Sequence, residues 1–168
     1  MTTRSVIPDG GKLVLTEELV EYMESGVSLL VGTRDATLRP ASARGFGVEI
    51  SAPNRTATVF IAAAGSPITL ANLRDNGQLA LTFSRPIDHR SLQVKGHVLS
   101  ISETDERQHQ LQARYVSRFA EGLIFTGLRQ NLLRRIRYFP SYAVHFRIES
   151  VFDQTPGPGA GRTTAVAS

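Results

Sequence analysis

Six stretches of the chain carry apolar and β-branched residues in patterns that are typical of β-strands. They are residues 27–32, 41–50, 56–63, 78–83, 89–98 and 142–152. The last stretch alternates most cleanly between apolar and polar residues, and the third is almost wholly apolar, which indicates a buried strand. Turn residues lie around 34–38 and 86–88, between neighbouring stretches. The pattern therefore predicts hairpins and a mainly β (α+β) fold.

Helical periodicity and capping residues predict four helices. They cover residues 16–26, 67–76, 103–120 and 128–138. In the second of these, Ser66 can accept a hydrogen bond from a free backbone N–H group, and Pro67 suits the first turn. Asn76-Gly77 ends it. The pattern thus places one short helix between two strands, and the last helix is rich in arginine.

The length and composition fit one domain with a sizeable core, since the chain has 168 residues and is 41% hydrophobic. We divide it into an N-terminal leader (residues 1–12), a single domain (13–154) and a Pro/Gly-rich tail (155–168). We expect the tail to be disordered from Arg162 onward. For residues 156–161, order near a subunit interface is the alternative, because a glycine-rich backbone can approach a partner closely.

Charge and cysteine content exclude several functional classes. The balance of 19 Lys and Arg against 15 Asp and Glu gives a net charge of only +4, and no nucleic-acid motif is present, so we expect no nucleic-acid partner. The absence of cysteine excludes disulfides, thiolate metal sites and cysteine nucleophiles. No apolar run is long enough to cross a bilayer, and we expect a cytoplasmic protein that does not bind membranes.

The order of motifs in residues 55–98 has a known parallel. A strand is followed by the Gly65-Ser66 helix start, a Leu73-x-x-Asn76 helix end, a second strand and a return strand with the pattern Arg-x-Leu-x-Val-x-Gly. This order resembles the pyridoxamine-5′-phosphate-oxidase-like FMN-binding split-barrel family. The resemblance implies a six-stranded antiparallel split β-barrel with flanking helices, assembled as a homodimer. It also implies FMN at the subunit interface, with deazaflavin F420 or haem as the alternatives.

The same resemblance assigns the cofactor-binding residues. Arg44 takes the place of the family's basic residue for the flavin phosphate, and a surface arginine at the barrel rim is the alternative. The helix start would offer its N–H groups to an anion, and the return strand would contact the flavin or its ribityl chain. The complete set is Arg44, Gly45, Phe46, Phe60, Ile61, Ala62, Ser66, Thr69, Ser91 and Gln93. Core packing, helix capping and plain solvation are the alternatives for these positions.

Two departures from the family pattern bear on function. At the helix start, where pyridoxamine phosphate oxidases carry a basic pair for the cofactor phosphate, this chain has Pro67-Ile68. Glu49 stands where the resemblance places the lysine for the substrate phosphate, and it would repel a phosphorylated substrate. Oxidation of pyridoxamine phosphate is therefore not expected. Basic residues of the other subunit could compensate for the missing pair, with Lys95, Arg90, Arg129 and the Arg134-Arg135-Arg137 cluster as candidates.

The sequence thus predicts a flavin-dependent oxidoreductase that takes a small-molecule substrate or electron donor. Its catalytic residues stay unassigned, because the cofactor carries the redox step. A non-catalytic flavin, deazaflavin or haem binding protein is the alternative. The four histidines have no metal-site spacing, so we predict no metal site.

Overall fold

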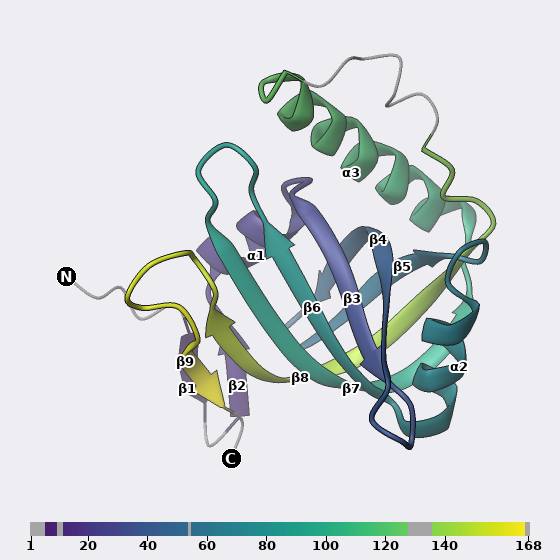
Figure 1. Ribbon diagram of the computed structural model, residues 1–168, viewed down its shortest axis with the longest axis horizontal. Helices are drawn as coiled ribbons and strands as arrows, with labels where there is room; N and C mark the ends of the chain where they lie inside the picture. Colours follow the sequence, from purple (N-terminus) through teal and green to yellow (C-terminus); the bar gives the residue numbers. More distant parts are fainter. Residues whose placement is uncertain (1–5, 10–11, 54, 128–135, 167–168) are drawn as a thin grey trace.

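Six antiparallel strands close into a barrel in the computed structural model, which describes residues 6–9, 12–53, 55–127 and 136–166 (Figure 1). The strands are β3 (Ser28–Arg34), β4 (Pro40–Ser51), β5 (Thr56–Ala62), β6 (Gln78–Ser84), β7 (Ser91–Glu103) and β8 (Ser141–Asp153). Their order is β5-β4-β3-β6-β7-β8, and pairing between β5 and β8 closes the barrel. The predicted six-stranded antiparallel barrel with flanking helices is confirmed.

Three further strands among the described residues lie outside the barrel. A hairpin of β1 (Val6–Asp9) and β2 (Lys12–Leu15) crosses the predicted boundary between leader and domain, and β9 (Arg162–Val166) pairs with β8. The expectation of disorder from Arg162 onward is therefore wrong. The physical reason is the length of β8: β5 pairs with its residues 141–147, and β9 pairs with residues 150–153 on the same edge. The tail thus satisfies backbone groups that β5 does not reach.

In the described part of the chain, three helices flank the barrel: α1 (Glu17–Glu24), α2 (Pro67–Asn76) and α3 (Glu106–Ile124). The first two match the predicted positions. The third begins later than predicted because β7 continues to Glu103, after which Asp105 and Gln108 form a capping box. The predicted helix 128–138 falls mostly on residues 128–135, which lie outside the described residues. Residues 136–138 have no helical structure, so the prediction is wrong at that end.

Inward-facing side chains of all six barrel strands fill the interior. Fully buried examples are Val31, Val59, Leu81, Phe83, Val94 and Phe146. Strand β2 and helix α1 add Leu13, Leu15, Leu19 and Met23 to the same apolar cluster. Alternation along each strand places one side chain in this core and the next on the outer surface. The outer surface of the barrel is consequently where polar chemistry can be placed. No described helix is long and apolar enough for a membrane span.

Gly96 lies at a close approach between β7 and β8, where the register shifts between Lys95 and Gly96. A Cβ added there would collide with the Arg147 carbonyl oxygen and lie 2.7 Å from Phe146 Cδ2. By contrast, a Cβ at Gly122 in α3 would meet no atom within 4 Å. Packing therefore requires a glycine at position 96 but not at position 122.

We therefore expect Gly96→Ala to lower the free energy of unfolding by about 2 kcal/mol or more, because the β7–β8 backbone must shift. Gly122→Ala is the control, and it should stabilise by up to about 1 kcal/mol because alanine favours a helix. Urea denaturation of both variants measures this. Equal stability of the two variants would contradict the packing argument.

The Tyr22 side chain links α1 to the β6–β7 hairpin through contacts with Arg90. Its hydroxyl donates to the Arg90 carbonyl oxygen at 2.6 Å, and the guanidinium of Arg90 lies 4.7 Å from the ring centroid. Arg90 also pairs with Glu18 of α1 at 2.9 Å. Burial raises the pKa of Tyr22 from 10.0 to about 12, because the phenolate loses hydration there. Burial also raises the pKa of Tyr115, whose hydroxyl donates to the Val27 carbonyl oxygen at 2.8 Å.

A group whose pKa is higher in the folded than in the unfolded state contributes its full stabilisation below the unfolded-state pKa. This contribution is lost as the pH rises through the folded-state pKa. Stability should therefore fall above pH 10.0, toward and beyond the Tyr22 pKa of about 12. We expect Tyr22→Phe to reduce this alkaline slope without abolishing it, since Tyr115 still titrates. Denaturation curves recorded at several alkaline pH values measure the slope. An unchanged slope in Tyr22→Phe would show that Tyr22 ionises equally in both states.

Candidate functional site

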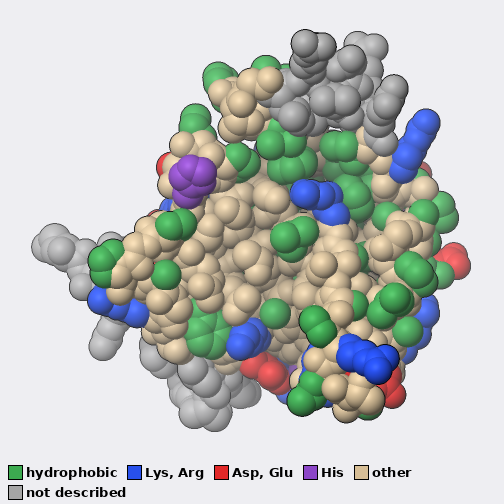
Figure 2. All heavy atoms as spheres, viewed as in Figure 1, with side chains coloured by type: hydrophobic (Ala, Val, Ile, Leu, Met, Phe, Trp, Pro, Cys, Tyr) green, Lys and Arg blue, Asp and Glu red, His purple; other side chains and the backbone are tan. Residues whose placement is uncertain are grey.

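The outer face of β3, β6 and β7 is open, since no helix crosses in front of these strands in Figure 1, and β4 continues the same sheet beside β3. Register places Arg44, Leu30, Thr82 and Gln93 in one row across these four strands. Leu30 is 44% exposed although it is apolar. Figure 2 shows this side of the molecule, where backbone and uncharged polar side chains predominate. Such a surface allows close approach of a flat ligand or a second sheet.

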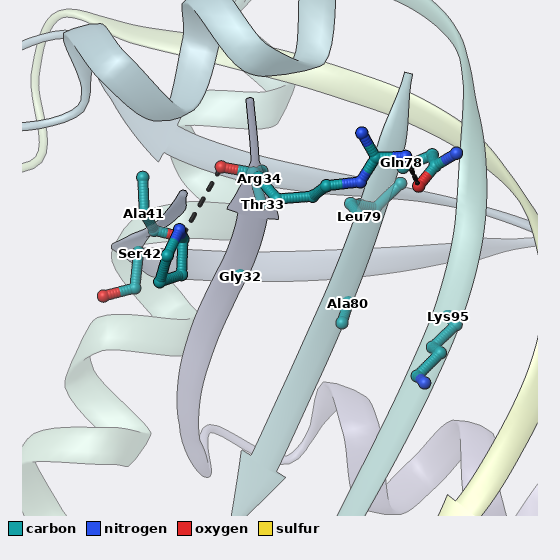
Figure 3. Close-up of a pocket in the computed structure, with 10 residues that line it drawn as sticks. Gly32, Thr33, Arg34, Ala41, Ser42, Gln78, Leu79, Ala80 and Lys95 are labelled. Atoms are coloured by element: carbon teal, nitrogen blue, oxygen red, sulfur yellow. Dashed lines mark hydrogen bonds between the residues drawn. The ribbon is translucent and has the colours of Figure 1, made fainter. Parts of the chain in front are cut away.

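A shallow groove of about 600 Å³ lies on this face. It is lined by Gly32, Thr33, Arg34, Pro40, Ala41, Ser42, Gln78, Leu79, Ala80 and Lys95. Arg34 crosses it to donate to Gln78 Oε1 at 2.9 Å (Figure 3). Lys95 lies over the ring of Phe152, with 4.9 Å from Nζ to the ring centroid. Two cations, Arg34 and Lys95, therefore line the groove together with several small residues.

Arg44 is exposed on β4, and its guanidinium has defined neighbours. It lies 5.3 Å from the ring centroid of Phe119 in α3, and Nη1 is 3.4 Å from Ser28 Oγ. Among the described residues no carboxylate pairs with it. A guanidinium that is held by an aromatic ring and a hydroxyl keeps its other N–H groups available for an anion.

Gly45 and Phe46 follow Arg44 at a bulge in β4, where the register against β5 shifts between Gly45 and Val48. A Cβ on Gly45 would lie 2.6 Å from Leu29 Cγ, so packing by itself explains this glycine. Phe46 is half-buried, and its ring centroid lies 5.8 Å from that of Tyr138. Phe46 thus has a partly exposed ring on the same strand as Arg44.

Phe60, Ile61 and Ala62 lie within β5 and are buried, the first two completely. Their backbone pairs with β8, and Ile61 also lies opposite Gly45 of β4. Phe60 and Ile61 are 0% exposed, and Ala62 is 4% exposed. Packing in the barrel accounts for these side chains, and contact of the β5 backbone with a flavin stays a prediction.

The start of α2 differs from its expected chemistry. The Ser66 side chain makes no capping hydrogen bond, so the prediction that its hydroxyl caps the helix is wrong. The helix begins instead with the backbone hydrogen bond from the Leu70 N–H to the Ser66 carbonyl oxygen. Ser66 and Thr69 are 4% and 2% exposed. Ile68 is 67% exposed. The helix start therefore presents an apolar side chain to solvent where the family has a basic pair.

Ser91 and Gln93 lie on β7, half-buried on the outer face. Ser91 Oγ is 2.9 Å from Ser84 Oγ and donates to the His89 carbonyl oxygen, and Gln93 Nε2 is 3.5 Å from Thr82 Oγ1. Three strand spacings separate β7 from β4, so Gln93 is about 14 Å from Arg44 along the same row. One chain by itself does not bring the predicted residues into one pocket.

Glu49 has a partner that the sequence did not reveal. Arg107 of α3 binds its carboxylate with both terminal nitrogens, at 2.5 and 2.9 Å. This fork ties α3 to the far end of β4 and occupies the carboxylate. The signal in the sequence is weak, since the two residues are 58 positions apart.

The histidines do not meet in a metal site. His145 bonds to Thr58 at 3.1 Å, and His109 bonds to Thr104 at 2.9 Å. His97 packs against Gly77 at the end of α2. Within the described ranges, no three His, Cys, Asp or Glu residues are grouped for a metal ion.

Sequence reasoning missed Arg34 and Gln78, and it did not connect Phe119 with Arg44. Arg34 and Gln78 stand at outward positions of β3 and β6, so alternation marks them as surface residues. Their approach to one another depends on the order β3-β6, which joins segments that are 44 positions apart.

Solved structures share this fold. The HupZ protein of Group A Streptococcus has a TM-score of 0.55 and 16% identity, covering 88% of this chain and 100% of that chain. A Lactobacillus delbrueckii protein, provisionally assigned as a pyridoxamine 5′-phosphate oxidase, has a TM-score of 0.53 and 16% identity, covering 88% and 98%. An F420 reductase has a TM-score of 0.51 and 13% identity, covering 78% and 93%.

The chain therefore has the split-barrel fold of pyridoxamine-phosphate-oxidase-like proteins, as the sequence predicted. No protein-family model matches the chain, and no curated protein matches its sequence.

Proposed function

We propose that this chain forms a homodimer that binds FMN against the outer face of β3, β4, β6 and β7 and acts as a flavin-dependent oxidoreductase. The observation that carries the proposal is Arg44, an exposed guanidinium without a carboxylate partner among the described residues, held between Phe119 and Ser28 beside a helix-free sheet face. Its N–H groups can donate to two of the three terminal phosphate oxygens of FMN. When bound, FMN supplies the hydride or electron transfer.

The size and the positive charge of the groove on β3, β4, β6 and β7 suit a flavin, whereas the start of α2 does not. Gly32, Ser42 and Ala80 give the groove small walls, and its volume of about 600 Å³ is in the usual range for small-molecule sites. Arg34 and Lys95 add positive charge. The start of α2 adds none, since Ile68 stands there. In this chain the phosphate would depend on Arg44 more than in proteins with a basic pair.

Dimerisation explains why the predicted residues are spread out. Arg44 and Gln93 lie about 14 Å apart, three strand spacings along one row of the sheet. A second sheet laid on this face would bury Leu30 and bring residues of both chains around one ligand. The homodimer is for this reason part of the proposal.

The substrate is not expected to carry a phosphate at Glu49. This carboxylate, although bound by Arg107, is 31% exposed and remains unsuited to phosphate. A small-molecule substrate or electron donor without a phosphate group at this position is the expected reactant.

The alternative function is non-catalytic binding of flavin, deazaflavin F420 or haem, and the exposed Ile68 favours it. Similarity to an F420 reductase supports including the deazaflavin.

Titration of the purified protein with FMN and with riboflavin tests the cofactor proposal. We expect about one FMN per chain, and we expect Arg44→Gln to weaken FMN binding about tenfold or more through loss of charge-assisted hydrogen bonds. Riboflavin, which lacks the phosphate, should bind both proteins equally. Arg39→Gln, at an exposed turn residue, is the control. Equal weakening of both ligands would mean that Arg44 holds the fold instead of the phosphate.

Reduction of the bound flavin by NADH, NADPH or reduced deazaflavin then separates the two functions. Turnover with one donor supports the oxidoreductase. A flavin spectrum without reduction by any of the three supports the binding protein.

The dimer is tested at Ala80, which lines the groove on β6. We expect Ala80→Arg to convert a dimer into a monomer and to abolish FMN binding, because the long cation prevents close approach of a second sheet. Ala71→Arg, at an exposed position of α2, should remain dimeric. Sedimentation velocity measures both. A dimeric Ala80→Arg variant would show that this face is not the interface.

A further inference from the structure

A separate pocket of about 440 Å³ lies between the first half of α3 and the segment that leads into β8. We call it the aromatic pocket, and it is lined by Glu106, His109, Gln110, Ala113, Tyr138 and Phe139. The groove on the outer sheet face shares none of these residues. The volume of the aromatic pocket is in the usual range for small-molecule sites, so it can hold a ligand of its own.

The rings at the aromatic pocket hold one another at defined angles. The ring of Phe139 meets that of His109 edge to face, at 89° and with centroids 4.1 Å apart. The rings of Tyr138 and Phe139 are tilted by 50° with centroids 5.2 Å apart, and Tyr138 also contacts Phe46 of β4 at 5.8 Å. Phe139 is nevertheless 42% exposed. Because the face of an aromatic ring carries negative partial charge, rings grouped in this way attract cations.

Hydrogen bonds join both walls of the aromatic pocket to the barrel. Thr104 Oγ1 lies 2.9 Å from His109 Nε2 and 2.9 Å from Ser141 Oγ, which ties the start of α3 to the first residue of β8. On the other wall, the Ala63 N–H donates to the Pro140 carbonyl oxygen at 2.8 Å, next to the two aromatic residues. The shape of the pocket therefore does not depend on a ligand.

The charged side chain in the lining of the aromatic pocket is a carboxylate. Glu106 is 82% exposed, and its Oε2 lies 3.7 Å from His109 Nδ1. Among the described residues that line the pocket there is no Lys or Arg. A helix N-terminus by itself favours an anion, but the capping box of Asp105 and Gln108 already occupies backbone N–H groups at the start of α3. A carboxylate beside aromatic rings favours a cation instead.

We infer that the aromatic pocket binds a small organic cation, with its ammonium group against the rings of Tyr138 and Phe139 and with Glu106 as the counter-ion. Alkyl groups on the nitrogen would also cover the exposed surface of Phe139, so a quaternary ammonium suits the pocket better than a bare ammonium. The inference goes beyond flavin binding and does not depend on it.

Calorimetric titration of the full chain with choline tests this inference. The matched ligand is neohexyl alcohol, the neutral isostere in which carbon replaces the charged nitrogen. We expect choline to bind, and we expect neohexyl alcohol to bind at least about fivefold more weakly, because it lacks the attraction of a cation to the rings and to Glu106. Titrations are made at about pH 8, where histidine side chains are ordinarily neutral. Absence of choline binding, or equal affinity for the two ligands, would overturn the inference.

Two substitutions separate the charge from the ring. Glu106→Gln keeps the size of the side chain and removes its charge, and Phe139→Leu keeps an apolar side chain and removes the ring. We expect each to weaken choline binding about two- to fivefold, and Glu106→Gln/Phe139→Leu to weaken it about tenfold or more. Binding of neohexyl alcohol should be unchanged in Glu106→Gln.

The matched control is Glu121→Gln/Phe125→Leu, which makes the same two changes at exposed positions toward the other end of α3, outside the aromatic pocket. It should bind choline as the native protein does, and equal affinity of the two double variants would contradict the assignment. Thermal denaturation first establishes that each variant is folded; if Phe139→Leu is not, Glu106→Gln against Glu121→Gln decides the question. FMN titration of Glu106→Gln should be unchanged, which keeps failure here distinct from failure of the flavin proposal.

Discussion

Backbone pairing along β8 is the constraint on which the rest of this structure depends. One edge of β8 pairs with β7, and the other pairs first with β5 and then with β9. The β5–β8 ladder closes the barrel, so every barrel strand has two neighbours and alternation sorts each side chain to the core or the outer surface. The exposed polar face of β3, β6 and β7 is a consequence of this closure.

The long β7 and β8 strands also position α3. Thr104 lies between β7 and α3, and its N–H and Oγ1 both bond to Ser141 at the start of β8. The helix that follows carries Arg107 to Glu49 and Phe119 to Arg44. One helix thus supplies the support of the candidate phosphate ligand and the acidic wall of the aromatic pocket. A shift of α3 would alter both sites together.

Charge is distributed differently around the two sites. On the sheet face, Arg44, Arg34 and Lys95 are separated, and no described carboxylate competes for Arg44. In the aromatic pocket, Glu106 supplies a carboxylate, and no Lys or Arg is among the described residues of the lining. The sheet face suits an extended anion with a flat part, and the aromatic pocket suits a cation. Pro67-Ile68 replaces the basic pair that the family resemblance implies for the cofactor phosphate, which is why Arg44 carries the argument for FMN.

The sequence by itself determined the strands and helices whose causes are local. Alternation in residues 78–83 and the Pro67 and Gly77 boundaries of α2 need no distant partner, and the order of these elements was enough for the split-barrel prediction. It could not determine β9, because residues 162–166 become a strand only beside the unpaired edge of β8. Nor could it separate the buried Ser66 and Thr69 from the exposed Arg44, since burial depends on which elements pack together. The Glu49–Arg107 fork and the aromatic pocket depend on contacts between residues far apart in the chain, and only the tertiary structure brings such residues within reach.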